Sequence, residues 1–174
     1  SAQTPAGLAG FEPGAELLAE AQRLTRSFAY KPPRAPAPTP IHGLFLMGSL
    51  GTLAQAEQSD MDLWVCHASE LDSDARDALR RKCDLLQSWA ASQGAEAHFF
   101  LIDPERFRSG ARDAQLTSDD CGTTQHVLLL DEFYRTAIWL AGRMPLWWLV
   151  PASDEHRYAH AVSYTHLTLP TNRE

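Results

Sequence analysis

The chain has 174 residues, 44% of them hydrophobic and 21% charged, which are ordinary proportions for a single globular domain. Its formal net charge of -7 argues against a surface that coats nucleic acid, because neutralising phosphates requires clustered Lys and Arg. No apolar stretch is long enough to span a bilayer, and three cysteines without close spacing favour a reducing, cytoplasmic location.

Residues 1–40 are expected to form a helix and a linker that precede the core. Apolar residues at helical spacing predict a helix over Ala15–Phe28, and Lys31–Pro40 is rich in X-Pro pairs, which favour extended chain. The folded core is then expected over residues 41–161. The segment from Val162 begins VSYTHLTLPT, which resembles a translated sequencing adapter, so residues 162–174 are expected to be a non-native tail.

The core is predicted to alternate strands with helices. Short apolar or alternating segments bounded by turn residues predict four strands, at Leu44–Met47, Met61–His67, Ala95–Ile102 and Leu146–Val150. Apolar stripes predict two helices: Asp72–Gln93, capped by Asp72 or Ser73 and closed by Gly94, and Gln125–Ala141, ended by Gly142. This mixture indicates an α+β fold.

Two aspartates in the second predicted strand are candidates for chemistry. Asp60 and Asp62 are one residue apart, so on a strand they point to the same face, opposite to Met61, Leu63 and Val65. Two such charges ~4 Å apart repel by about 4 kcal/mol at an effective dielectric of ~20, so the pair suggests a cation site. Nucleotidyl transfer uses divalent ions held by paired carboxylates in this way.

A Gly-Ser pair directly after the first predicted strand is the second candidate feature. Gly48 allows the backbone to approach a phosphate closely, and backbone N–H groups and the Ser49 hydroxyl can donate hydrogen bonds to phosphate oxygens. A helix starting near Gly51 would add its positive N-terminal end. Alone, a Gly-Ser turn or an Asp-x-Asp pair is common; their order carries the information.

That order resembles the DNA polymerase β-like nucleotidyltransferase fold, a mixed β-sheet with flanking helices. An apolar strand, Gly-Ser, a spacer, Asp-x-Asp, a long helix and another strand follow one another. Within that superfamily, the strings SDMDLWVCH and TQHVLLLDEFYRT resemble the catalytic region of enterobacterial class I adenylate cyclases, from about Pro40 to about Tyr158. Members of that family are much longer, so the resemblance implies a truncated catalytic core.

The resemblance implies conversion of ATP to 3′,5′-cyclic AMP and pyrophosphate. Asp60 and Asp62 would bind two Mg2+ ions: one to activate the nucleophile and one to steady the leaving oxygens. Regulatory proteins would act through the missing C-terminal region. No nucleic-acid partner is expected.

Four further residues would contact ATP if the resemblance holds. Gly48 and Ser49 would hold the triphosphate, and Ser59 and Trp64 lie in the same motif. Trp64 shares the face of the two aspartates, so it either stacks on adenine or packs beneath it.

The fold usually supplies a third carboxylate from the strand after the long helix. Glu96, near the start of Ala95–Ile102, is the preferred candidate, as a metal ligand or as the general base for the ribose 3′ hydroxyl. Asp103 is the rival, but strand parity places it on the opposite face and at the far end.

Two other functions remain open from the sequence. A nucleotidyltransferase that adenylylates another acceptor would use the same metal site. A noncatalytic nucleotide-binding module is the second, and truncation makes it realistic for this chain alone.

Overall fold

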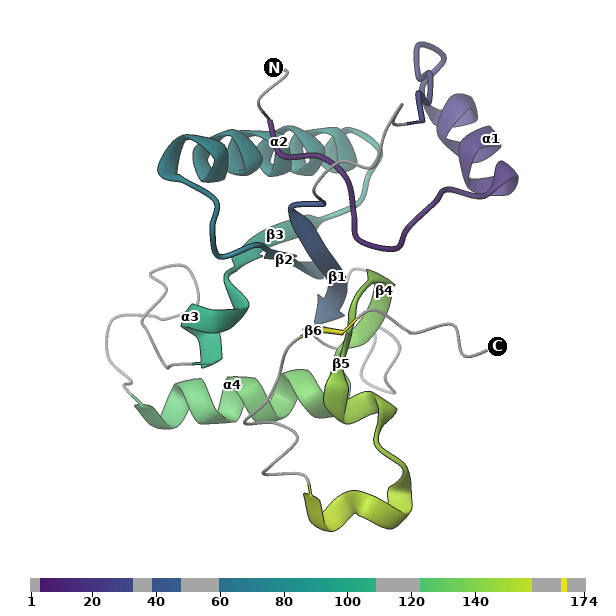
Figure 1. The fold of residues 1–174 in the computed structure, drawn as a ribbon. Coiled ribbons are helices and arrows are strands. Elements are labelled where there is room, and N and C mark those ends of the chain that lie inside the picture. Colours follow the sequence, from purple (N-terminus) through teal and green to yellow (C-terminus); the bar gives the residue numbers. More distant parts are fainter. Residues whose placement is uncertain (1–3, 33–38, 48–59, 109–122, 158–166, 169–174) are drawn as a thin grey trace.

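A four-stranded sheet with the order β3-β2-β1-β4 lies at the centre of the chain (Figure 1). The structure is a computed structural model that describes residues 4–32, 39–47, 60–108, 123–157 and 167–168. The strands are β1 Ile41–Met47, β2 Met61–His67, β3 Ala97–Ile102 and β4 Ile138–Gly142. β1 pairs antiparallel with both β2 and β4, whereas β2 and β3 run parallel, so the sheet is mixed.

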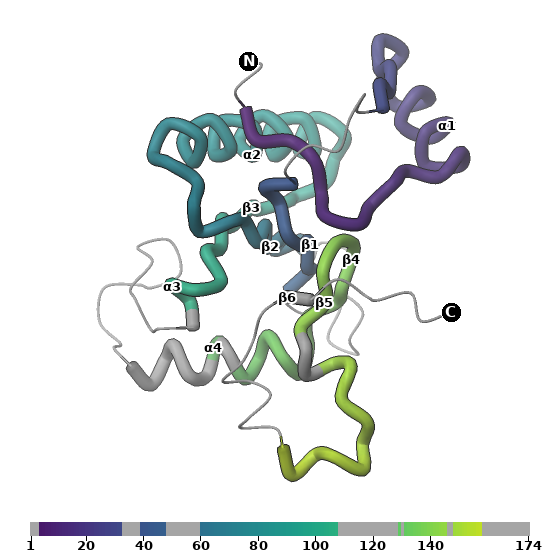
Figure 2. Tube along the Cα trace, in the orientation of Figure 1, coloured from purple at the N-terminus to yellow at the C-terminus, as the bar shows by residue number. Residues whose placement is uncertain are grey.

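Helices cover both faces of this sheet (Figure 1). The helices are α1 Ala15–Leu24, α2 Ser73–Ser92, α3 Pro104–Arg108 and α4 Thr123–Thr136. α2 connects β2 to β3 and packs on one face, while α3 and α4 lie on the other. The N-terminal segment runs past α2, where the Lys82 ammonium donates to the Pro5 carbonyl at 3.3 Å (Figure 2).

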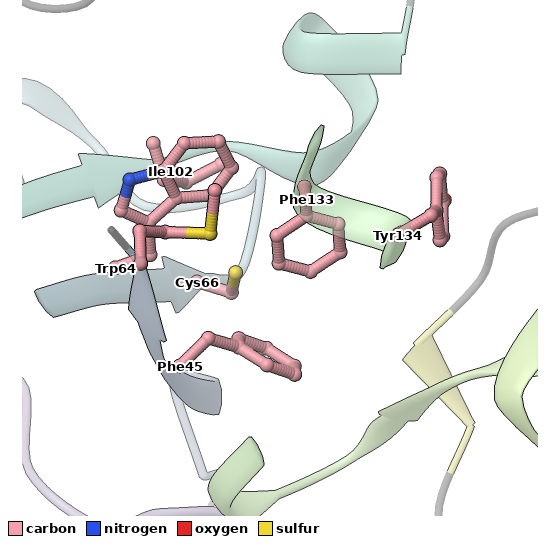
Figure 3. Close-up of a cluster of buried hydrophobic side chains, with 7 residues drawn as sticks. Phe45, Trp64, Cys66, Ile102, Phe133 and Tyr134 are labelled. Carbon is pink, nitrogen blue, oxygen red and sulfur yellow. The ribbon is translucent and has the colours of Figure 1, made fainter. Parts of the chain in front are cut away.

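Side chains on the two faces of the sheet form two hydrophobic clusters, as strand alternation requires. Toward α2, Val65 and Leu101 pack with Leu79 and Cys83. The second cluster lies toward α4 and contains Phe45, Met47, Trp64, Cys66, Ile102, Phe133 and Tyr134 (Figure 3). Both faces of β2 are therefore buried along its second half.

The strand–helix–strand unit β2-α2-β3 agrees closely with the prediction from the sequence. The strand Met61–His67 is confirmed, and α2 lies within one residue of each predicted end of Asp72–Gln93. The Asp72 side chain accepts a hydrogen bond from the Ala75 N–H at 2.8 Å, and Gly94 has φ +82° just beyond the helix. The α+β class with a mixed sheet and flanking helices is confirmed, and the element order is the one expected of a nucleotidyltransferase fold.

The last part of the predicted helix 125–141 is wrong. α4 ends at Thr136, and Ile138–Gly142 forms the edge strand β4. Ile138 and Trp139 are residue types that favour strands. β1 is a largely buried strand, so backbone groups on its second side need partners, which β4 supplies. Gly142, predicted to end a helix, instead ends this strand at φ +92°.

The predicted strand Leu146–Val150 is also wrong, because Leu146–Leu149 forms a 3-10 helix. This turn lets the Trp148 indole N–H donate to the Tyr134 carbonyl at 2.9 Å. That carbonyl belongs to the last turn of α4, whose carbonyls have no partner within the helix. The turn also brings the Trp148 ring to 5.7 Å from the ring of Phe45.

The remaining elements are small. α1 stops at Leu24, short of the predicted Phe28, and Ala152–Arg157 forms a second 3-10 segment. β5, Met144–Pro145, pairs with β6, Leu167–Thr168, which lies within the predicted tail. The helix expected to start near Gly51 lies outside the described residues, as do residues 109–122. Among the helices that are described, none has both the length and the apolar character to cross a membrane.

Gly142→Ala should destabilise the fold more than Gly94→Ala. Both glycines have positive φ, which costs a non-glycine residue roughly 1–2 kcal/mol. A Cβ at Gly142 would also lie 2.5 Å from the His42 carbonyl oxygen and 2.7 Å from the Gly43 Cα, whereas a Cβ at Gly94 meets nothing within 4 Å. Chemical denaturation measures both losses, and equal losses would contradict the close packing of β4 on β1.

Candidate functional site

The starts of β2 and β3 lie side by side because the two strands are parallel. Met61 pairs with Ala97 in the register, and the Met61 N–H donates to the Glu96 carbonyl at 2.9 Å. Asp60 and Glu96 are the residues that immediately precede these two strands. Residues that are far apart in the sequence therefore meet at one edge of the sheet.

Strand alternation then selects which side chains share that edge. Asp60 and Asp62 from β2, together with Glu96 and His98 from β3, are the "metal edge" of the sheet. The candidate ligand atoms of Asp60, Glu96 and His98 all lie within 4.8 Å of one another. The His98 Nε2 is 3.4 Å from the Glu96 Oε1. The side chains of Asp60 and Glu96 are exposed, so a ligand can reach them from solvent.

Asp62 lies deeper than Asp60. It pairs with His98 on β3 and with Met47 on β1. Burial raises the pKa of Asp62 above its ordinary value, and the charge of Asp60 adds to this, while His98 opposes it. The ionised pair is therefore electrostatically unfavourable without a cation nearby.

This donor set fits a divalent cation. Three carboxylates offer the oxygen ligands that Mg2+ takes, and two of them are open to solvent, which leaves room for the waters that Mg2+ retains. Asp60 and Glu96 would provide ligands from the two strand starts, and Asp62 would provide one from β2. The site therefore has the composition that the sequence predicts for metal-assisted chemistry.

Three predicted ATP-binding residues, Gly48, Ser49 and Ser59, lie outside the described residues. The residue before Gly48 is described: Met47 ends β1 and pairs with Asp62. The chain therefore leaves β1 next to the aspartates. The roles of Gly48, Ser49 and Ser59 stay predictions.

Trp64 is a core residue, with 3% of its surface exposed. Its ring stacks on Phe133 from α4 at a centroid distance of 5.2 Å and an interplanar angle of 8° (Figure 3). It also meets the Phe107 ring edge-on at a centroid distance of 5.3 Å. This position agrees with the alternative in which Trp64 packs beneath the site. Stacking on adenine would need a free face of the indole.

Asp103, the rival for the third carboxylate, has a structural role at the opposite ends of β2 and β3. Its Oδ1 accepts hydrogen bonds from the Ser69 hydroxyl at 2.7 Å and from the N–H groups of Glu105 and Arg106 at 3.0 and 3.2 Å. It thus caps α3 and ties it to the loop after β2. Burial alone would raise the pKa of Asp103, but these hydrogen bonds outweigh it and lower the pKa.

His98 is the residue that sequence reasoning missed. The sequence did contain a signal for this residue. His98 follows Glu96 by two residues, so both side chains lie on the same face of the strand. The sequence prediction named only carboxylates as metal ligands. The structure brings this ring into contact with Glu96.

The model of the adenylate cyclase N-terminal domain family matches residues 1–148 of this chain. The chain belongs to that family. Curated adenylate cyclases from Shigella flexneri and Escherichia coli strain K12 are 56% and 55% identical to it over 119 residues, and that of Yersinia pestis is 50% identical over 126 residues. These alignments cover 68–72% of this chain but only 14–15% of each relative's length.

Two solved toxin–antitoxin structures align with this cyclase-family chain. A mutant of the MntA–HpeT toxin–antitoxin is 16% identical, and a toxin–antitoxin with AMP-PNP is 19% identical. Each comparison covers 83% of both chains with a TM-score of 0.35.

Asp103→Asn should lower the free energy of unfolding by about 1 kcal/mol at pH 7, the difference between a charged and a neutral acceptor. Because the folded state lowers the pKa of Asp103, the charge stabilises the fold above pH 3.8, and this stabilisation is lost as the pH falls through the folded-state pKa. The difference in the free energy of unfolding between wild type and Asp103→Asn should therefore become smaller below pH 3.8. Denaturant titrations at several pH values measure it, with the exposed Glu105→Gln as a control that changes stability by less than about 0.5 kcal/mol. A gap that widens in acid would contradict the capping role.

Proposed function

We propose that this chain carries the metal- and nucleotide-binding part of an adenylate cyclase, which converts ATP to 3′,5′-cyclic AMP and pyrophosphate. The supporting observation is the meeting of Asp60 and Glu96 at one edge of the sheet, with Asp62 beside them, in a chain of the adenylate cyclase family. The chain spans 14–15% of the length of the relatives it matches, so the rest of such a protein would contribute whatever this segment lacks.

Asp60 and Asp62 would hold Mg2+ in this site, with Glu96 as a third ligand or as a base. Bound there, Mg2+ would supply the positive charge that offsets the triphosphate and favours loss of a proton from the attacking hydroxyl. The raised pKa of Asp62 means that its ionised form is disfavoured in this site. A bound cation would offset this, because it favours the ionised form of both Asp60 and Asp62. Asp60 and Asp62 share a face of β2, so together they would hold the two Mg2+ ions that the proposed reaction uses.

Glu96 is the proposed acceptor for the proton of the ribose 3′ hydroxyl. Its side chain is 67% exposed, so a bound nucleotide can reach it. The 3′ oxygen attacks the α-phosphorus, the bond from that phosphorus to the bridging oxygen breaks, and pyrophosphate leaves with the electron pair. Gly48, Ser49 and Ser59 are proposed to donate hydrogen bonds to the phosphates.

The core beneath the site would keep this geometry fixed. Trp64 follows Asp62 on the same face of β2 and is held between α3 and α4 by Phe107 and Phe133. A buried, packed ring next to the carboxylates limits the movement of β2. Because charged groups that are already held in position need little rearrangement during the reaction, they stabilise the transition state more effectively.

An adenylyltransferase acting on a separate acceptor would use the same metal edge. The family match favours the cyclase, because the curated relatives carry the name adenylate cyclase over the matched segment. A noncatalytic nucleotide-binding module would bind ATP without turning it over.

The direct test is a chimera in which the matching 119 residues of this chain replace those of the K12 enzyme. We expect acceptor-independent formation of cyclic AMP from ATP and Mg2+. Asp60→Asn with Asp62→Asn should reduce it at least about a hundredfold, since metal assistance contributes several kcal/mol and each ~1.4 kcal/mol is tenfold in rate.

Matched single variants in the same chimera separate the two carboxylate candidates. Glu96→Gln should reduce cyclic AMP formation, whereas Asp103→Asn, at the opposite strand ends, should leave it nearly unchanged once folding is verified by circular dichroism. Undiminished activity in the double aspartate variant would overturn the proposed site. ATP binding without cyclic AMP would favour the noncatalytic module, and transfer to an added acceptor would favour the adenylyltransferase.

A further inference from the structure

The metal edge contains one nitrogen donor among its oxygen donors. His98 Nε2 lies 3.4 Å from Glu96 Oε1, and the ligand atoms of Asp60, Glu96 and His98 are mutually within 4.8 Å. Two atoms bound to one ion at about 2.1 Å lie at most about 4.2 Å apart. Small rotations of these three side chains, which are exposed or partly exposed, close the difference.

The position of His98 is set by the sheet rather than by the side chain itself. Its backbone pairs with Asp62 in the parallel register, and its parity places it on the face of Asp60 and Glu96. The side chain is 38% exposed, so the ring lies at the border between sheet and solvent. β3 therefore places the His98 imidazole close to the carboxylates of Asp60 and Glu96.

The chemistry of this donor set differs from that of an all-carboxylate site. Mg2+ takes oxygen ligands and gains little from an imidazole, whereas Zn2+ and its first-row neighbours bind imidazole well. Two carboxylates and one imidazole give three protein ligands and leave a position open for water or substrate. The site should therefore bind transition-metal ions such as Zn2+ more tightly than Mg2+.

We propose that Asp60, Glu96 and His98 form a site that selects first-row transition-metal ions such as Zn2+ and Cu2+ over Mg2+, with His98 as the selecting ligand. This inference rests on the proposed metal site and concerns the ion that occupies it. Zn2+ then competes with Mg2+ for the same carboxylates. His98 acts as a ligand, not as a residue that merely positions Glu96.

Calorimetry on the chain without nucleotide, with Zn2+ and Mg2+ as separate probes, tests the selectivity. Wild type should bind Zn2+ at least about tenfold more tightly than Mg2+. His98→Gln should weaken Zn2+ at least about tenfold, because loss of even an outer partner of a ligand costs 10- to 100-fold. Mg2+ affinity should change by less than about threefold, since its ligands are oxygens. His156→Gln, at an exposed histidine of the second 3-10 segment, is the matched control and should change neither.

Pulsed EPR of bound Cu2+, a paramagnetic ion that binds imidazole well, gives a second readout that does not depend on activity. Wild type and His156→Gln should show coupling of the ion to an imidazole nitrogen, and His98→Gln should lose it. Absence of that coupling in wild type, or unchanged Zn2+ affinity in His98→Gln, would overturn the proposal. Equal weakening of Zn2+ and Mg2+ would also overturn it, because it would mean that His98 only positions Glu96.

The same chain separates this inference from the proposed function. ATP binding with Mg2+ is measured independently by calorimetry. Zn2+ selectivity through His98 in a chain that binds no ATP supports this inference and counts against the proposed function. ATP binding with no preference for Zn2+ overturns this inference and leaves the proposed function intact.

Discussion

The parallel pairing of β2 with β3 is the constraint on which the candidate site depends. It places the starts of two strands next to each other, although α2 separates them in the sequence. A shift of one residue in this register would send Glu96 and His98 to the opposite face and leave Asp60 and Asp62 without partners. The geometry of the metal edge therefore depends on the register between β2 and β3.

The hydrophobic core on the α4 side of the sheet also stabilises the register between β2 and β3. Phe45 of β1, Trp64 of β2, Ile102 of β3 and Phe133 of α4 meet in one cluster, so three strands and a helix share their packing. Phe45 is fully buried and contacts both Phe133 and Trp148 through its ring edges or face. The aromatic cluster and the carboxylates thus occupy adjacent parts of one sheet face. The apolar part holds the strands, and the polar part remains open to solvent.

The sequence allowed the central strand–helix–strand unit and the shared face of Asp60 and Asp62 to be predicted, because those signals are local. Asp60 and Asp62 share a face by strand parity, and the capping residue Asp72 and the glycine Gly94 delimit α2. The strand nature of Ile138–Gly142 was missed because it depends on β1 needing a partner, which is a tertiary requirement. The turn at Leu146–Leu149 was missed for a similar reason: Trp148 satisfies a carbonyl of α4. His98 was missed because a metal site was sought among carboxylates alone.

The direction of α2 has a consequence for the order in which ligands arrive. Its C-terminal end leads through Gly94 directly to Glu96, and its last turn carries no basic residue. The helix macrodipole therefore turns its negative end toward a sheet edge that already carries three carboxylates. A bare triphosphate would meet a repulsive field there, while a cation would be attracted. The proposed nucleotide would thus enter as its metal complex, or after the metal, and not as the free anion.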